Sequence, residues 1–184
     1  MSTFFSKTGD DGTTGLLGEE RVSKFDLRIE TLGTLDELTT VLGFAKTLCE
    51  DPIRREISNI QVKIYEIMAE VAATPENQEK FKKISEISVN DLENTIELYS
   101  GQIEKPKGFI LPGDTTSSAA LSMSRAVTRR AERRLVELDN RGSIGNRELL
   151  RYINRLSSCL FVFELYVIQH EIGATLTLSK GKST

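Results

Sequence analysis

Three stretches of the sequence repeat apolar residues at alternating spacings of three and four, and this periodicity restricts the fold more than any other feature. One of them continues for almost three heptads, through Ile53, Ile57, Ile60, Ile64, Ile67 and Val71. A spacing that averages about 3.5 residues puts these side chains on one face of an α-helix. Helices with such stripes pack side by side, so the sequence predicts an antiparallel helical bundle.

Five helices are expected, in one domain of 184 residues. The first covers residues 35–49, the second 53–71, a weaker third runs from Asn90 to Ile103, the fourth from 115–118 to about Leu138, and the fifth covers 149–167. Asp51 is the candidate N-cap of the second helix, with Pro52 in its first turn. The polar stretch 74–88 is expected to be a mobile connection, and only residues 109–111 resemble a strand. The predicted fold class is all-α, with an irregular N-terminal segment (1–32), a helical bundle (33–173) and a tail (174–184).

Composition excludes several classes of function. Lys and Arg number 24 against 27 Asp and Glu, a net charge of −3, so we expect neither nucleic acid nor a membrane as partner. The sequence has one histidine, His170, so a His-based zinc site or a Ser-His-Asp triad elsewhere in the chain is excluded. His170 itself is expected on the surface near a helix end. Cys49 and Cys159 lie in apolar sequence, as expected for buried thiols in a reducing compartment. No signal pattern or spanning apolar run is present, so the expected location is the cytoplasm.

The first candidate site is the glycine-rich segment 7–15, which reads KTGDDGTTG. Glycines at every third position let backbone N–H groups approach an anion, and Lys7 adds positive charge. No Gly-Lys-Ser/Thr follows, so the segment is not a Walker A loop. Tight turns explain the same composition without a ligand. Lys24 is a further candidate phosphate ligand, with a solvated surface lysine as the alternative.

The second candidate site is on the fourth helix, where residues 125–134 carry five arginines and one glutamate, a local charge of +4. Arg125, Arg129 and Glu132 lie within about 60° of one another and form one stripe of this helix. Arg133 lies close beside them. Arg130 and Arg134 point away from the stripe. Like charges this close repel one another unless an anion binds them. A polyphosphate ligand and a solvated basic face remain alternatives, and few aromatic residues support a nucleic-acid surface.

Two further polar residues stand out. Asn154 interrupts the apolar pattern of the last helix, where an amide needs a partner or lies at the boundary of the core. Asp36 lies early in the first helix, where an acid favours the helix dipole or pairs with an arginine such as Arg125.

Taken together, these segments resemble the PduO-type ATP:cob(I)alamin adenosyltransferases over about residues 4–168. Six segments occur in the order of that family: 7–14 (KTGDDGTT), 20–24 (ERVSK), 33–38 (GTLDEL), 109–113 (FILPG), 129–133 (RRAER) and 152–157 (YINRLS). The resemblance implies a trimer of helical bundles with active sites between neighbouring subunits. It also implies transfer of the 5′-deoxyadenosyl group of ATP to cob(I)alamin, with release of triphosphate.

The resemblance assigns a role to each matching position. The ATP-binding positions are Ser6, Lys7, Thr8, Gly9, Thr14, Gly15, Lys24, Arg129, Arg130, Glu132, Arg133 and Asn154. Among these, Lys24, Arg129 and Glu132 are the expected catalytic residues, with Mg²⁺ held mainly by the phosphates. Phe109 is expected to lie against the corrin and to disfavour a lower axial ligand. Asp36 and Arg125 are the expected pair between subunits.

Two positions depart from the family pattern. Asp114 stands where the family often has glycine, and Ser158 where it commonly has aspartate. An ordered tail over the corrin is not expected, because the chain ends soon after the last helix.

Expected partners include a corrinoid reductase and a B12-dependent mutase or dehydratase. The alternatives are a non-catalytic nucleotide or corrinoid sensor or chaperone, and a helical module that binds polyanions.

Overall fold

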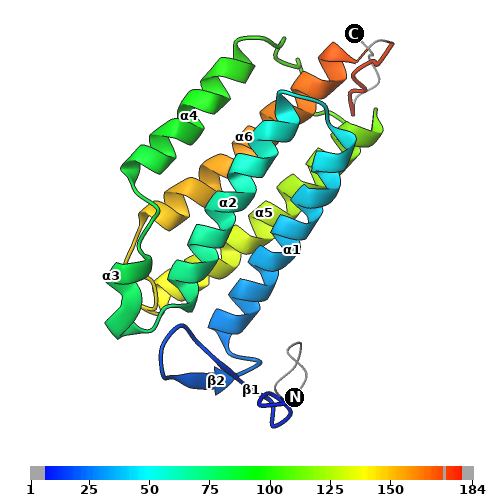
Figure 1. Ribbon diagram of the computed structural model, residues 1–184. Helices are drawn as coiled ribbons and strands as arrows, with labels where there is room; N and C mark the ends of the chain where they lie inside the picture. The colour runs from blue at the N-terminus through cyan, green and yellow to red at the C-terminus, as the bar shows by residue number, and fades with distance from the viewer. Residues whose placement is uncertain (1–6, 172, 180–184) are drawn as a thin grey trace.

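The computed structural model describes residues 7–171 and 173–179 as a helical bundle with a small two-stranded sheet at one end (Figure 1). The elements in chain order are β1 (Thr13–Gly15), β2 (Arg21–Ser23), α1 (Leu27–Leu48), α2 (Ile53–Ala72), a 3₁₀ turn (Pro75–Asn77), α3 (Gln78–Phe81), α4 (Glu86–Ser100), α5 (Thr116–Asn140) and α6 (Glu148–His170). Helix α1 packs on α2 and α5, and α6 packs on α5 and α4. Neighbouring helices are antiparallel except α4 and α6, which run in the same direction.

The apolar stripes form the core, as the periodicity predicted. Ile57, Ile64 and Ile67 of α2 are completely buried, and so are Leu156 and Phe163 of α6. Burial of one such side chain contributes roughly 1.5–3 kcal/mol, so these stripes hold the bundle together. Within the described part of the chain, no helix is long and apolar enough to cross a membrane.

Two helix starts differ from the expectation. Helix α1 begins at Leu27, because the Asp26 carboxylate accepts a hydrogen bond from the Arg28 amide at 2.7 Å and caps the helix there. Gly33 therefore lies within a helix and does not mark its boundary. Asp51 does not cap α2 but forms an ion pair with Arg55 at 3.2 Å.

The polar stretch 74–88 contains more structure than expected. It holds the 3₁₀ turn and the single-turn helix α3, so the described chain has six α-helices and not five. Asn146 anchors its end, since the side-chain amide donates to the Ile84 carbonyl at 2.9 Å. Helix α4 begins at Glu86, before Asn90, and ends at Ser100, which leaves Ile103 in the following loop.

The sequence predicted an irregular N-terminal segment within an all-α fold, but the described part of this segment contains a small β-sheet. Strands β1 and β2 pair in antiparallel register, with Thr13 opposite Ser23. The segment is joined to the end of α2 by hydrogen bonds from the Leu17 amide to the Ala72 carbonyl (2.8 Å) and from the Thr74 amide to the Leu17 carbonyl (3.3 Å). A side chain at Gly18 would collide with Thr74, so this close approach requires glycine.

Residues 173–179 pack against the loop that precedes α5. The expectation that no ordered tail lies over the corrin stays a prediction. The Leu111 amide donates to the Thr177 carbonyl at 2.9 Å, and the Ser179 amide donates to the Phe109 carbonyl at 2.8 Å. The strand expected at 109–111 is thus a single bridge, between Ile110 and Leu178. Asp114, one of the two departures from the family pattern, accepts a hydrogen bond from the Thr177 amide at 2.9 Å.

Candidate active site

The glycine-rich segment is held in shape by two basic residues, Arg21 in β2 and Lys24 directly after it. The Arg21 guanidinium donates to the Thr8 carbonyl at 2.6 Å and to the Thr13 hydroxyl at 2.7 Å. Lys24 donates through Nζ to the Gly9 carbonyl at 2.7 Å. Asp11 accepts hydrogen bonds from the backbone and side chain of Thr13, which lower the pKa of its carboxyl. The predicted positions 7–9, 14–15 and 24 therefore lie on one compact loop structure.

Arg21 is a residue of this loop that the sequence did not single out, although it lies in the same segment as Lys24. Lys7 is exposed and has a positive φ of 61°, so its backbone adopts a conformation rare for a residue with a side chain. Ser6, which the resemblance placed among the ATP-binding positions, lies outside the described residues.

Helices α5 and α6 bring a second group of predicted residues together. Asn154 on α6 donates through Nδ2 to Glu132 Oε1 on α5 at 2.7 Å. Its Oδ1 accepts a hydrogen bond from Arg155 at 2.9 Å, and Arg155 is paired with Glu93 of α4 at 2.8 Å. The amide in the apolar helix therefore has partners at both of its ends.

The arginines of α5 divide between two directions, as the helical geometry predicted. Arg129 and Arg133 are exposed, and Arg133 donates through Nη1 to the Arg129 carbonyl at 3.0 Å. Arg130 instead forms an ion pair with Glu37 of α1, and Arg134 lies 3.7 Å from Glu30 of the same helix. Arg129 and Arg133 are thus the α5 arginines that remain available to an anion beside Glu132.

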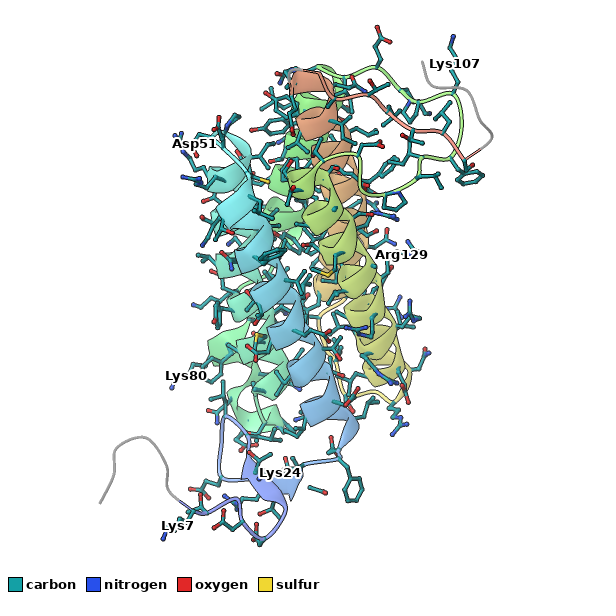
Figure 2. All side chains as sticks on the ribbon, turned by 90° about the vertical axis from the view of Figure 1, so that its right-hand side faces the viewer. Lys7, Lys24, Asp51, Lys80, Lys107 and Arg129 are labelled. Carbon is teal, nitrogen blue, oxygen red and sulfur yellow. The ribbon has the colours of Figure 1, made fainter. Side chains whose placement is uncertain are left out.

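The two groups of residues are far apart within one chain. Figure 2 shows Lys7 and Lys24 at the lower end of the bundle, whereas Arg129 lies about halfway along α5. Asp36 is exposed on α1, and among the described residues of one chain it forms no ion pair with Arg125, so their pairing between subunits stays a prediction. The partner of Arg125 in this structure is Glu164 of α6, at 3.7 Å.

An apolar pocket of about 860 Å³ opens between the end of α4, the loop before α5, and α6. Its apolar lining comes mainly from Ile103, Phe109, Ile110, Phe161, Val162 and Leu165. Phe109 is 86% exposed, which is unusual for so large an apolar side chain and is typical of a surface that a ligand or partner covers. Lys107, also in the lining, projects at the upper end of the molecule in Figure 2.

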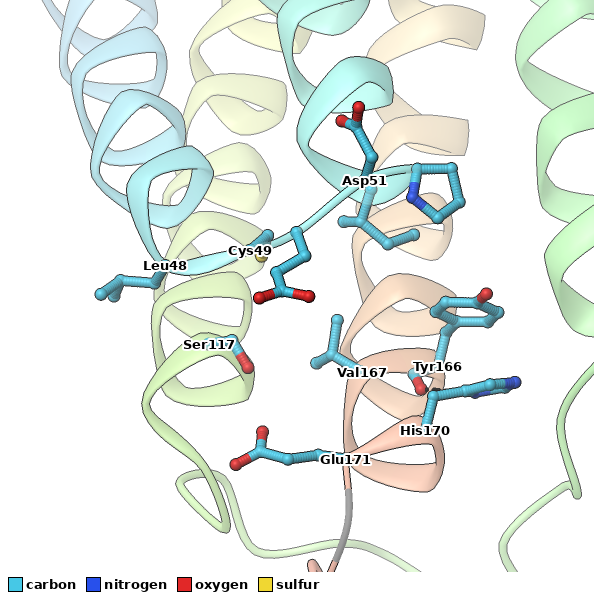
Figure 3. Close-up of a pocket in the computed structure, with 11 residues that line it drawn as sticks. Leu48, Cys49, Asp51, Ser117, Tyr166, Val167, His170 and Glu171 are labelled. Atoms are coloured by element: carbon cyan, nitrogen blue, oxygen red, sulfur yellow. Dashed lines mark hydrogen bonds between the residues drawn. The ribbon is translucent and has the colours of Figure 1, made fainter.

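A second pocket, of about 510 Å³, lies where the turn between α1 and α2 meets the ends of α5 and α6 (Figure 3). Its polar wall includes the carboxylates of Glu50, Asp51 and Glu171. His170 lines it, exposed at the end of α6 as predicted, with its ring stacked on Tyr166 at a centroid distance of 4.0 Å. None of the predicted ligand-binding residues lines this pocket.

Other polar sites add no metal centre. Among the residues that the structure describes, no group of three or more His, Cys, Asp or Glu side chains could hold a metal ion. Cys49 and Cys159 are both buried and unpaired, and burial raises the pKa of the Cys49 thiol to about 11. Neither cysteine is therefore a thiolate at neutral pH.

Comparison with known proteins decides which family the chain represents. The family model described as cobalamin adenosyltransferase matches residues 4–167. The chain belongs to the cobalamin adenosyltransferase family. A corrinoid adenosyltransferase of Citrobacter freundii is 37% identical over 164 residues, which cover 88% of this chain and 92% of the relative.

The corrinoid adenosyltransferase PduO of the same organism is 40% identical over 159 residues, 85% of this chain. The chain spans only about half of that relative, 47% of its length. Among solved structures, a phenylalanine-to-alanine variant of a PduO-type ATP:corrinoid adenosyltransferase from Lactobacillus reuteri, complexed with cobalamin and ATP, is similar with a TM-score of 0.87. It shares 32% identity, and the match covers 97% of this chain and 100% of that one.

Glu164 is a second residue, after Arg21, that the sequence analysis overlooked. The sequence showed it only as a charge that interrupts an apolar run. The structure buries it completely and places it beside Arg125. A lone acid in an apolar helix was the available signal, but its partner lies 39 residues away on another helix, which the spacing does not reveal.

Proposed function

We propose that this protein transfers the 5′-deoxyadenosyl group of ATP to cob(I)alamin, giving adenosylcobalamin and triphosphate. The observation that carries the proposal is the match, over nearly the whole chain, to an adenosyltransferase solved with cobalamin and ATP. Arg125 lines the apolar pocket and lies on the same stripe of α5 as Arg129 and Glu132, so one face of this helix supplies a wall for each substrate.

The active site is formed between copies of the chain. Lys7 and Lys24 lie at one end of the bundle and Arg129 lies about halfway along it, so one copy supplies the loop and another supplies the stripe. The resemblance to the PduO-type enzymes supports a homotrimer as this assembly. In that assembly, Asp36 of one copy pairs with Arg125 of the next.

The chemistry needs stabilisation of a leaving anion more than it needs a base. Co(I) is a strong nucleophile, so the protein's main task is to offset the charge that develops on the departing triphosphate. One well-placed donor in such a site is worth roughly 3 kcal/mol of barrier. Lys7, Lys24 and Arg129 supply these donors together with backbone N–H groups of the loop, and Arg130 and Arg133 add positive potential.

Glu132 and Asn154 orient the nucleotide. Asn154 uses one N–H on Glu132, and its carbonyl oxygen accepts from Arg155, which fixes the amide plane. The second N–H and the second lone pair of the amide remain for the ribose or adenine. Mg²⁺ enters with the phosphate oxygens of ATP, where it neutralises charge and holds the triphosphate in one geometry.

Phe109 has an electronic role. An apolar ring that covers the lower face of the corrin keeps water and other axial ligands away from cobalt, which raises the reduction potential of the corrinoid. The electron comes from a corrinoid reductase, and a B12-dependent mutase or dehydratase uses the product.

The test is an anaerobic assay with chemically reduced cobalamin and MgATP, in which cob(I)alamin absorbance is lost while adenosylcobalamin and triphosphate are released in equal amounts. Saturable binding of both substrates without product would instead identify a sensor or chaperone. Salt-sensitive binding of polyanions without a saturable ATP site would identify a polyanion-binding module.

A further inference from the structure

Glu164 is a buried charge that the proposed chemistry does not use. Its side chain is completely buried on α6, and no hydrogen bond of good geometry reaches either carboxylate oxygen from the described residues. Burial raises the pKa of its carboxyl, while the Arg125 guanidinium and the nearby Ser122 hydroxyl act in the opposite direction. A buried acid so weakly hydrogen-bonded costs free energy, so its presence in the core calls for a physical reason.

Arg125 connects this carboxylate to the apolar pocket. Its Nε lies 3.7 Å from Glu164 Oε2 and is buried without an acceptor. The guanidinium lies over the Phe161 ring, 5.6 Å from its centroid, and the side chain lines the same pocket as Phe109. One side of Arg125 thus faces the core and another faces the pocket, with about a third of the side chain exposed.

This ion pair is a poor device for stability. At 3.7 Å it lacks the hydrogen bond that would offset the desolvation of a fully buried carboxylate. It is, however, well suited to fix the direction of a long cationic side chain, which would otherwise extend into water.

We propose that Glu164 is a positioning residue for corrinoid binding. It holds Arg125 by the Nε side, so that the guanidinium stays over the Phe161 ring as part of the pocket wall. The terminal nitrogens of Arg125 then remain free to donate to acceptors beyond α5 and α6. These are the Asp36 carboxylate of the neighbouring copy and the carboxamide oxygens at the edge of the corrinoid. The inference rests on the proposed function, since it takes the corrinoid as the occupant of this pocket.

The test compares Glu164→Gln with the matched control Glu137→Gln, which breaks exposed ion pairs with Arg134 of α5 and with Arg141, the residue that follows this helix. Each protein is titrated with cob(II)alamin in the presence of ATP, and binding is followed by visible absorbance. In Glu164→Gln, Arg125 is no longer held in place and loses its charge-assisted contact with the corrinoid. This predicts about a tenfold rise in the corrinoid Kd. The Kd for ATP and the control variant's corrinoid Kd should not change. An unchanged corrinoid Kd for Glu164→Gln refutes the proposal.

Thermal unfolding separates positioning from a structural role. Glu164→Gln removes a desolvated charge, which favours the folded state, but it also leaves the partly exposed Arg125 without its counter-ion, which disfavours it. The two effects oppose each other, so only a small change in Tm is expected. A lower Tm together with weaker binding of both ligands would show that the residue only supports the fold, and would overturn the proposal.

A double-mutant cycle with Arg125→Gln tests whether Glu164 acts through Arg125. In the Arg125→Gln background, Glu164→Gln should weaken corrinoid binding by less than about twofold, because the side chain that it orients is gone. Two full, additive effects would refute the link. Wild-type protein that binds corrinoid without turnover would defeat the proposed function alone, whereas wild-type protein that binds none would defeat both.

Discussion

Replacing Asn154 with aspartate puts a second carboxylate opposite Glu132 and changes almost nothing in shape. In the native protein, the Asn154 amide donates to Glu132 Oε1 at 2.7 Å. The substitution removes that hydrogen bond, which is worth about 1 kcal/mol, and replaces it with repulsion between two negative charges. Two such charges at about 4 Å repel by about 1 kcal/mol in water and by more near a protein surface.

The side chain of Asn154 is exposed and Arg155 lies beside it, so solvent and this cation screen the repulsion. The expected total is about 2 kcal/mol of lost stability at neutral pH, which for a chain of this size lowers Tm by about 4–8 °C. The pair repels only when both carboxyls are ionised. One of them takes up a proton as the pH falls, so the deficit should shrink below about pH 5.

The assay is thermal unfolding from pH 4 to pH 8, with MgATP titrations at neutral pH. We expect the ATP Kd to rise about tenfold, because the amide plane that faces the nucleotide is lost. Asn94→Asp is the control, since Asn94 is exposed on α4 and makes no side-chain hydrogen bond among the described residues. A Tm deficit that is equal at pH 4 and pH 8, or equal in both variants, would refute the reasoning.

Three further outcomes are expected. Arg129→Ala should lower kcat/KM for ATP by at least about tenfold without changing the oligomeric state measured by light scattering. Unchanged kinetics would mean that α5 does not bind the leaving group. Arg141→Ala, directly after the end of α5, is the control. Phe109→Ala should keep ATP affinity but form less ligand-free cob(II)alamin, which unaltered EPR spectra of the bound corrinoid would contradict. Gly18→Ala should displace Thr74 and reduce hydrogen-exchange protection of β1 and β2 by about tenfold, with protection of α6 as the internal reference.

The helical part of the fold could be predicted because each long helix carries its own signal. The stripe that contains Ile57 and Ile64 needs no other part of the chain to be recognised, and it is buried as expected. The start of α1 could not be predicted from the stripe, because the Asp26 cap lies outside it. Strands β1 and β2 have three residues each, too few for an alternating pattern to appear.

The candidate site was predictable where it depends on one helix and unpredictable where it depends on two. The angular separation of Arg129 from Arg130 follows from helical geometry alone, and Arg130 does face α1. The pairing of Glu132 with Asn154 joins α5 and α6, whose relative rotation the sequence does not define. The same limit hid Glu164, whose partner depends on how the two helices pack.

The bridge between the C-terminal segment and the Phe109 loop restricts the number of residues between α6 and the bridge more than it restricts which residues they are. Backbone groups make the two bonds from residues 109 and 111 to residues 179 and 177, so most side chains there are free to vary. Leu176 and Leu178, however, alternate with Thr177 and pack with Ile110 and Leu165 in a small apolar cluster. Deleting one residue between His170 and Leu176 would move the threonine into that cluster and turn the leucines outward. Insertions and deletions in this segment should therefore disturb Phe109 more than any point change.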